Sequence, residues 1–381
     1  MRPRDPREPH RAATSLELFF DLVFVIAVST AAVNLHHALV EAHVLDGVVS
    51  YLLVFFAIWW AWMNFTWFAT SFDADDWLYR VLTIVQMGGV LVLAAGVGPA
   101  FHGDFTIPVV GYVIMRVAMV AQWLRASRGA GRARRTTLMY ALGIAVVQVY
   151  WLLTLLVPEG AFLVAFLIGV VLELAVPIIA ERGANTPWHP HHITERYGLF
   201  TLILLGESLL ASANAIIEAL EDADALAPLI AIAVLTLVVT AALWWIYFWP
   251  PHHSAIGSLA QSIRYGYVHY VVFAAAGAFS AGVEVEIDAL THHSELTGPA
   301  AASTVTIPIA LFVLGIWWIA IRAHADRVVN TVVPVGAVLV LLDALLPFPL
   351  ALSAVILVAI VVVLVLRSPR SAEAPLPGQA R

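Results

Sequence analysis

The stretch LELFFDLVFVIAVSTAAVNLHHA, residues 16–38, is the first of a series of apolar segments of about 20 residues. An α-helix needs about that length to cross a hydrocarbon core about 30 Å thick. The sequence therefore predicts twelve membrane-spanning helices. They cover residues 16–38, 48–69, 77–97, 105–124, 136–157, 161–180, 197–217, 227–249, 265–283, 300–321, 328–346 and 348–366.

The composition supports an all-α integral membrane protein whose surroundings are the lipid bilayer. Hydrophobic residues make up 61% of the chain and charged residues 12%, against about 25% charged residues in soluble domains. The chain has no cysteine, which excludes disulfides, thiolate metal sites and cysteine nucleophiles. The net charge of -7 gives no reason to expect a nucleic-acid partner. No Gly-rich phosphate loop stands out, and we expect no cofactor.

Arginines fall in alternate connections between the apolar segments. Because cytoplasmic loops carry the excess of positive charge, we expect these connections and both termini on the cytoplasmic side of a bacterial inner membrane. The opposite connections carry acids such as Glu41, Asp104 and Glu159 instead. The arginines that set this topology are Arg2, Arg4, Arg7, Arg11, Arg80, Arg125, Arg128, Arg132, Arg134, Arg135, Arg182, Arg196, Arg264, Arg322, Arg327, Arg367, Arg370 and Arg381.

The chain looks duplicated. Residues 58–62 read IWWAW in the second segment, and residues 243–247 read LWWIY in the eighth. An even number of spans in each half predicts two parallel six-helix repeats related by an axis along the membrane normal. We expect a cytoplasmic tail over residues 1–15, halves over 16–180 and 197–366, a cytoplasmic connection over 181–196 and a disordered cytoplasmic tail over 367–381.

Ionisable residues inside the spans are the candidate functional residues, because each costs about 2.5 to 3.5 kcal/mol at the bilayer centre without a partner or aqueous cavity. Arg116 and Glu173 lie in the fourth and sixth spans, and Glu207 at the centre of the seventh. Asp21 lies near the start of the first span and shares a helix face with Glu17.

Arg116 is expected to pair with Glu207 or Glu173 and to leave the other acid able to take up a proton. Glu207 would then line a translocation path together with Asn214, seven residues later on the same helical face. The alternative is that these charges only hold helices together.

Two polar segments at the cytoplasmic interface allow a metal-site interpretation. The sequence SFDADDWLYR carries Asp73, Asp75 and Asp76 beside Arg80. These carboxylates could hold a divalent cation, but we favour a helix start in which Asp76 pairs with Arg80. The histidines of WHPHH (188–192) and PPHH (250–253) could meet in a zinc site, an interpretation that we do not favour.

Three motifs, in order along the chain, resemble the low temperature requirement protein A family of bacterial multi-spanning membrane proteins. They are ELFFDLVFV (17–25), WWAWMNFTWFATSFDADDWLYRVLTIVQMGGVLVLA (59–94) and HITERYGLFTLILLGESLLA (192–211). The resemblance implies a membrane location. It directs attention to the charged or special positions inside the motifs, which are Glu17, Asp21, Asp75, Asp76, Arg80, Glu195, Arg196, Gly206 and Glu207.

These observations favour a transporter or permease that moves a small solute or ion through a polar central path, with Asp21 and Glu207 in coupling or coordination. One alternative is a membrane-embedded enzyme that acts on lipid through a metal held by the aspartates and histidines. Another is a scaffold or sensor without turnover. A homo-oligomer is compatible with each of these functions.

Overall fold

The computed structural model describes residues 1–6, 8, 11–219 and 226–367, so the expected C-terminal tail lies outside the described residues. Within the described part, helices follow one another from end to end with no strand. The main helices are α1 (Ser15–Val40), α2 (Val44–Phe72), α3 (Trp77–Ala95), α4 (Val97–Phe101), α5 (Thr106–Ser127), α6 (Arg134–Thr154), α7 (Glu159–Ala180), α8 (Pro190–Ala219), α9 (Leu226–Phe248), α10 (Leu259–Leu290), α11 (Pro299–Ile316), α12 (Arg327–Asp343) and α13 (Pro349–Arg367).

The expected multi-span helical architecture is confirmed. In the described part of the chain, 11 helices are long and apolar enough to cross a membrane. The remaining expected span, the eleventh (328–346), corresponds to α12, which has 17 residues. Helix α8 begins at Pro190, inside the segment 181–196 that we expected to be a connection. The reason is that His192 and Arg196 are buried against α1, so burial of this turn extends the helix.

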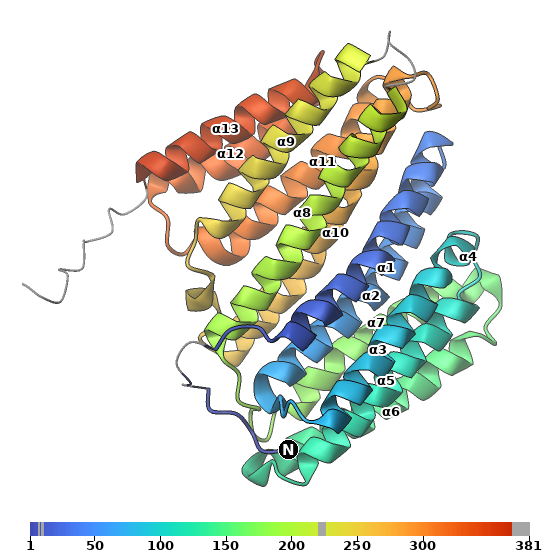
Figure 1. Cartoon of the computed structure of the whole chain (residues 1–381), viewed down its shortest axis with the longest axis vertical. Coiled ribbons are helices and arrows are strands. Elements are labelled where there is room, and N and C mark those ends of the chain that lie inside the picture. The colour runs from blue at the N-terminus through green and yellow to red at the C-terminus, as the bar shows by residue number, and fades with distance from the viewer. Residues whose placement is uncertain (7, 9–10, 220–225, 368–381) are drawn as a thin grey trace, which may run out of the picture.

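The connections that carry or adjoin arginines meet at one end of the bundle (Figure 1). We call this the arginine-rich end and define it by the connections 73–76, 128–133, 181–189, 249–258 and 322–326. Arg80 and Arg264 lie in the helices that follow the connections 73–76 and 249–258. Contacts hold it together: Arg4 lies 3.3 Å from Asp73, and Arg125 pairs with Asp76. The arrangement agrees with the alternation of arginines in the sequence.

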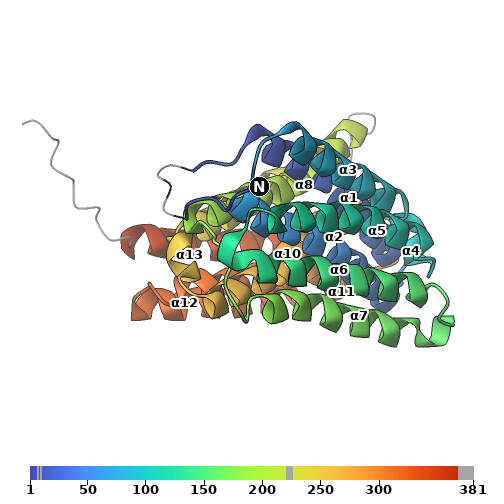
Figure 2. The same cartoon turned by 90° about the horizontal axis from the view of Figure 1, so that it is seen from below.

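Helices α1 to α7 form one group and α8 to α13 a second (Figure 1). Figure 2 shows α1 and α8 on one side of the molecule and α7 along the opposite side. Helices α1 and α2 of the first group pack on α8 and α10 of the second. Any residue on the inner faces of these four helices therefore lies between the two groups.

Each group contains a close helix crossing at a glycine. A Cβ atom on Gly111 of α5 would lie 2.4 Å from the backbone nitrogen of Leu93 on α3, and one on Gly282 of α10 would lie 2.2 Å from the carbonyl oxygen of Thr304 on α11. Small residues let membrane helices approach closely without the packing of large side chains. These glycines fix the α3–α5 and α10–α11 pairs that flank the centre of the bundle.

Candidate functional site

Two helices from different groups bring four polar side chains together at the α1–α8 contact. Glu17 and Asp21 lie four residues apart on α1, and His192 and Arg196 lie four residues apart on α8. Residues at this spacing share one helix face. All four side chains are fully buried.

Arg196 is the centre of this cluster, which we call the interface cluster. Its Nη1 lies 3.0 Å from Oε1 of Glu17, and its Nε and Nη2 lie 3.2 Å and 2.5 Å from the two carboxylate oxygens of Asp21. This two-point contact is the geometry in which a guanidinium matches a carboxylate best. Trp62 of α2 donates its indole N–H to Asp21 at 2.7 Å. The cluster therefore joins α1, α2 and α8.

The start of α1 positions Glu17 for this contact. Thr14 caps the helix and accepts from the Glu17 N–H, while the Glu17 carboxylate accepts from the Thr14 N–H at 2.8 Å. This reciprocal pattern is a capping box. His192 adds a contact, since its Nε2 lies 3.2 Å from Glu17. Its Nδ1 is buried without a partner among the described residues, so we place the ring hydrogen on Nε2.

The interface cluster carries more negative than positive charge. Two carboxylates share one guanidinium, and with a neutral His192 one negative charge remains in a fully buried place. Arg11 lies nearby, but its guanidinium donates to the backbone carbonyls of Ala69 and Thr70. Because a buried charge needs a partner, this cluster favours the uptake of a proton or another cation.

A second buried cluster, here called the balanced cluster, lies inside the first group. Arg116 on α5 donates from Nη2 to Glu173 on α7 at 2.7 Å, so the Glu173 alternative for its partner is confirmed. The Glu173 carboxylate also accepts from Trp60, Tyr112, Gln148 and Trp151. These donors use up the acceptor capacity of the carboxylate, and one guanidinium balances one carboxylate.

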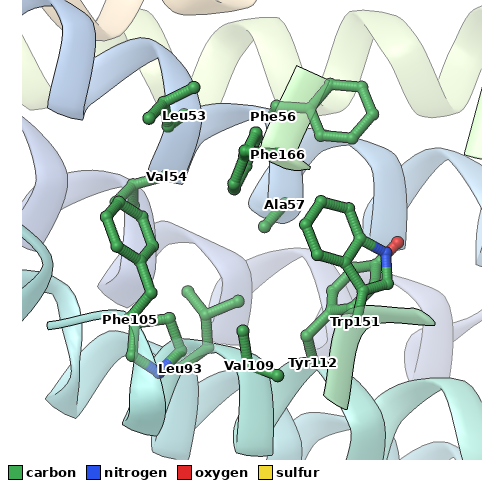
Figure 3. Close-up of a pocket in the computed structure, with 11 residues that line it drawn as sticks. Leu53, Val54, Phe56, Ala57, Leu93, Phe105, Val109, Tyr112, Trp151 and Phe166 are labelled. Carbon is green, nitrogen blue, oxygen red and sulfur yellow. The ribbon is translucent and has the colours of Figure 1, made fainter. Parts of the chain in front are cut away.

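Apolar side chains surround the balanced cluster. Tyr112 and Trp151, which both donate to Glu173, also line a small cavity of about 30 Å³ with Phe105 and Phe166 (Figure 3). The remaining wall consists of Leu53, Val54, Phe56, Ala57, Leu93, Pro108 and Val109. These surroundings favour a structural role for the Arg116–Glu173 pair, which was the alternative left open from the sequence.

Helix α2 contacts both clusters through two tryptophans of the sequence WWAW (59–62), which are separated by one alanine. Trp60 donates to Glu173 at 2.8 Å, and Trp62 donates to Asp21 at 2.7 Å. Both side chains are fully buried. An indole has one donor and no acceptor, so each ring satisfies a carboxylate while filling the space between helices.

Glu207 and Asn214 lie outside both clusters. Glu207 is half-buried on α8 and Asn214 is exposed on the same helix. Arg116 contacts Glu173 and not Glu207. The role of Glu207 in a translocation path stays a prediction, and the carboxylates that lie at the contact between the two groups of helices are Glu17 and Asp21.

The aspartates after α2 each contact an arginine or a helix end. Asp75 pairs with Arg80 at 2.9 Å, whereas Asp76 caps α3 and pairs with Arg125. The expected pair between Asp76 and Arg80 is therefore wrong, because the capping carboxylate points away toward α5. Hydrogen bonds from Arg80 and Arg125 lower the pKa of Asp75 and Asp76, while burial raises the pKa of Asp73. The geometry favours the helix-start interpretation of this segment.

The histidines of the WHPHH and PPHH motifs do meet, but as stacked rings. His191 and His253 lie with their ring centroids 4.1 Å apart. In the described residues, no group of three or more His, Asp or Glu side chains is arranged to hold a metal ion. Glu195, the remaining motif residue, is exposed on the surface of α8.

Several side chains that contact the buried carboxylates were not predicted from the sequence. They include His192, Trp62, Trp60, Tyr112, Gln148 and Trp151. A signal was present, because His192 and Arg196 repeat the spacing of Glu17 and Asp21. Two matching pairs of opposite character on two spans predict facing helices.

Comparison with known proteins gives one family and one relative. The profile of a family described as bacterial low temperature requirement A protein (LtrA) matches residues 12–366, nearly the whole chain. A protein of Rhizobium meliloti (strain 1021), described as uncharacterized protein RA0937, is 28% identical over 241 residues. That alignment covers 61% of this chain and 57% of the relative, so the chain spans somewhat more than half of its length.

Proposed function

The chain belongs to the bacterial low temperature requirement A family, and from that premise we propose that it carries a small solute or ion across the bacterial inner membrane. In this proposal Glu17 and Asp21 form the exchangeable proton site. The observation that carries it is the sharing of one guanidinium by two buried carboxylates. Intramembrane carboxylates of this kind mark proton relays and ion paths.

The location of the interface cluster supports coupling between charge and movement. Arg196 belongs to one group of helices, while Glu17 and Asp21 belong to the other. A proton on Asp21 would weaken its contact with Arg196 and so loosen the α1–α8 contact. A deprotonated pair would draw the two helices together. Two arrangements of the helix groups with different proton occupancy are what a coupled carrier requires.

The two groups support an internal repeat. Helices α1, α2, α3 and α5 find counterparts in α8, α9, α10 and α11, because the contacts α1–α2, α1–α3, α2–α5 and α3–α5 recur as α8–α9, α8–α10, α9–α11 and α10–α11. The close glycine crossings lie at the α3–α5 and α10–α11 contacts in this correspondence. We propose that the halves are parallel repeats, an arrangement in which carriers place the solute site between the halves.

We place the arginine-rich end in the cytoplasm, as the charge distribution of the loops favours. The absence of cysteine from the chain gives a labelling test without background. A single cysteine at Gly131 should react with a membrane-impermeant thiol reagent only after the cell is permeabilised, and one at Gly103 should react in intact spheroplasts. The reverse pattern would overturn the topology.

The test of function is a solute-uptake screen in proteoliposomes, with and without a proton gradient and with a pH dye inside. We expect solute-dependent proton movement that Asp21→Asn abolishes. The matched control is Asp75→Asn, which removes an aspartate whose carboxylate contacts exposed Arg80. Equal flux in wild type and Asp21→Asn would reject the coupling role. A screen without flux for any solute would favour the enzyme or scaffold alternatives.

A further inference from the structure

A second pocket, with a volume of about 60 Å³, lies at the arginine-rich end between the two helix groups. Its walls include five aromatic side chains, from α2, α5, α6, the α7–α8 connection and α10. They are Trp67, Trp123, Tyr140, Trp188 and Tyr267. The interface cluster does not contribute to this pocket, which we call the aromatic pocket.

One carboxylate lines the aromatic pocket. Glu181 follows the last residue of α7 and is only 6% exposed. It accepts from the Tyr140 hydroxyl at 2.9 Å, the Thr186 hydroxyl at 2.7 Å and the Thr186 N–H at 2.8 Å. Among the described residues, no arginine forms an ion pair with it. Burial raises the pKa of Glu181, as expected for a carboxylate without a cationic partner.

Two further polar atoms in the wall lack partners. The Ser262 hydroxyl and the Trp123 indole N–H are buried and form no hydrogen bond within the described part of the chain. Ser262 is 2% exposed and Trp123 is 4% exposed. Buried polar groups in proteins are almost always paired, so these two atoms point to occupied space in the pocket. Next to a cation, which accepts no hydrogen bond, the partner of the Trp123 N–H is a water molecule.

Two pairs of aromatic rings line the pocket. Trp123 and Tyr140 stack face to face with centroids 4.2 Å apart, and Trp67 meets Trp188 edge to face at 6.3 Å. Cages of aromatic rings bind quaternary and methylated ammonium groups through the negative faces of the rings. A divalent metal ion would need an oxygen-rich shell, whereas a single carboxylate among rings suits an organic cation.

We propose that the aromatic pocket binds a small organic cation of the alkylammonium class, with its charge beside Glu181 and its methyl groups against the rings. The volume of the aromatic pocket, about 60 Å³, agrees with a ligand of this size. A cavity volume of about 10–15 Å³ holds one water molecule, so the pocket holds a group of a few heavy atoms. The statement that this cation is the transported solute rests on the proposed function. The statement that the pocket binds the cation does not depend on transport.

The probe is tetramethylammonium chloride, titrated calorimetrically into the purified full-length protein in detergent. A second titration uses 3,3-dimethylbutanol, the neutral counterpart of choline. We expect saturable binding of the cation. The neutral compound should bind at least about tenfold more weakly than the cation, because cation–π attraction and the attraction to the carboxylate both require a positive charge on the ligand. Sodium chloride at the same ionic strength should not compete.

Glu181→Gln should weaken tetramethylammonium binding about tenfold or more. The matched control is Glu195→Gln, which removes an exposed carboxylate from the first turns of α8 and should leave binding unchanged. Trp188→Leu removes one half-exposed ring and should also weaken binding, so it tests the site if Glu181→Gln fails to fold.

Equal binding of the neutral compound, no binding of the cation, or equal effects of Glu181→Gln and Glu195→Gln would each overturn the proposal. Flux assays on the same variants separate it from the proposed function. Binding without proton-linked flux would leave the aromatic pocket supported and the carrier refuted. Proton-linked flux of a different solute, without cation binding, would support the carrier and refute the aromatic pocket as a cation site.

Discussion

Removing one carboxylate should destabilise the protein far more in the balanced cluster than in the interface cluster. In the balanced cluster, Glu173→Gln leaves Arg116 fully buried without a counter-charge. Breaking a buried pair in this way costs about 3–5 kcal/mol. In the interface cluster, Asp21→Asn removes the excess negative charge and leaves Glu17 paired with Arg196. It loses charge-assisted hydrogen bonds worth about 1.5–3 kcal/mol, partly offset by the lost repulsion between the two acids.

The measurement is thermal unfolding of the detergent-solubilised protein, followed by tryptophan fluorescence. With about 2 °C of midpoint shift for each kcal/mol in a large chain, Glu173→Gln should lower the midpoint by about 6–10 °C. Asp21→Asn should lower it by about 2 °C. The double variant Arg116→Met, Glu173→Gln should recover most of the loss, because it removes both charges together.

The comparison decides the charge assignment. If Asp21→Asn destabilised the protein as much as Glu173→Gln, both clusters would depend equally on their acids, and the interface cluster would not carry an excess charge. If the double variant were no more stable than Glu173→Gln alone, the loss would come from the other donors to the carboxylate, and not from an unpaired Arg116.

Three further changes test other parts of the structure. Burial lowers the pKa of His252 from 6.5 to about 4. The unfolded chain therefore takes up a proton as the pH falls below about 6.5 while the folded protein does not, so stability should be complete above about pH 6.5 and decline toward pH 4. A pH series of midpoints should show this decline, and His252→Gln should flatten it. Asp75→Asn should change stability by less than about 1 kcal/mol, and EDTA should leave the midpoint unchanged; a large effect of EDTA would revive the metal interpretation. Gly89→Ala should lower the midpoint by about 2–6 °C, because its Cβ would lie 2.6 Å from Met115 and overpacking costs about 1–3 kcal/mol, whereas adjacent Gly88→Ala meets nothing within 4 Å and should not.

Most of the fold follows from the sequence because two strong physical effects act on it. Apolar length determines the spans, and the alternation of arginines orders them, so the helices lie near their expected positions. The start of α8 at Pro190 was not predicted. A helical turn rich in polar residues resembles a loop in sequence unless the helix that it packs against is known. His192 and Arg196 are helical because Glu17 and Asp21 face them.

The candidate site was predicted by residue type more than by partner. Asp21, Arg116 and Glu173 are buried charges, as their positions inside the spans indicated. Glu17 is buried as well, although it lies at the start of its expected span. Which acid faces which cation depends on the rotation of each helix and on the contacts between distant spans. The hydropathy of a segment gives neither the rotation of its helix nor its contacts with distant spans. Glu207 shows the limit, because its central position in α8 matches that of a buried acid but its side chain is only half-buried.

Helix α2 contacts both clusters, each through a different tryptophan. Through Trp60 it is held to Glu173, within the first group of helices, by a contact whose charges cancel. Through Trp62 it touches Asp21, where α1 meets α8 of the second group and the charges do not cancel. In the balanced cluster the charges cancel and the Glu173 carboxylate is fully hydrogen-bonded, so this contact has no reason to change with pH, although Nε and Nη1 of Arg116 are buried without a partner in the described part of the chain. An unbalanced contact between two groups of helices responds to every proton it gains, so any movement linked to protonation should occur at the α1–α8 contact and leave the α2–α5–α7 contact intact.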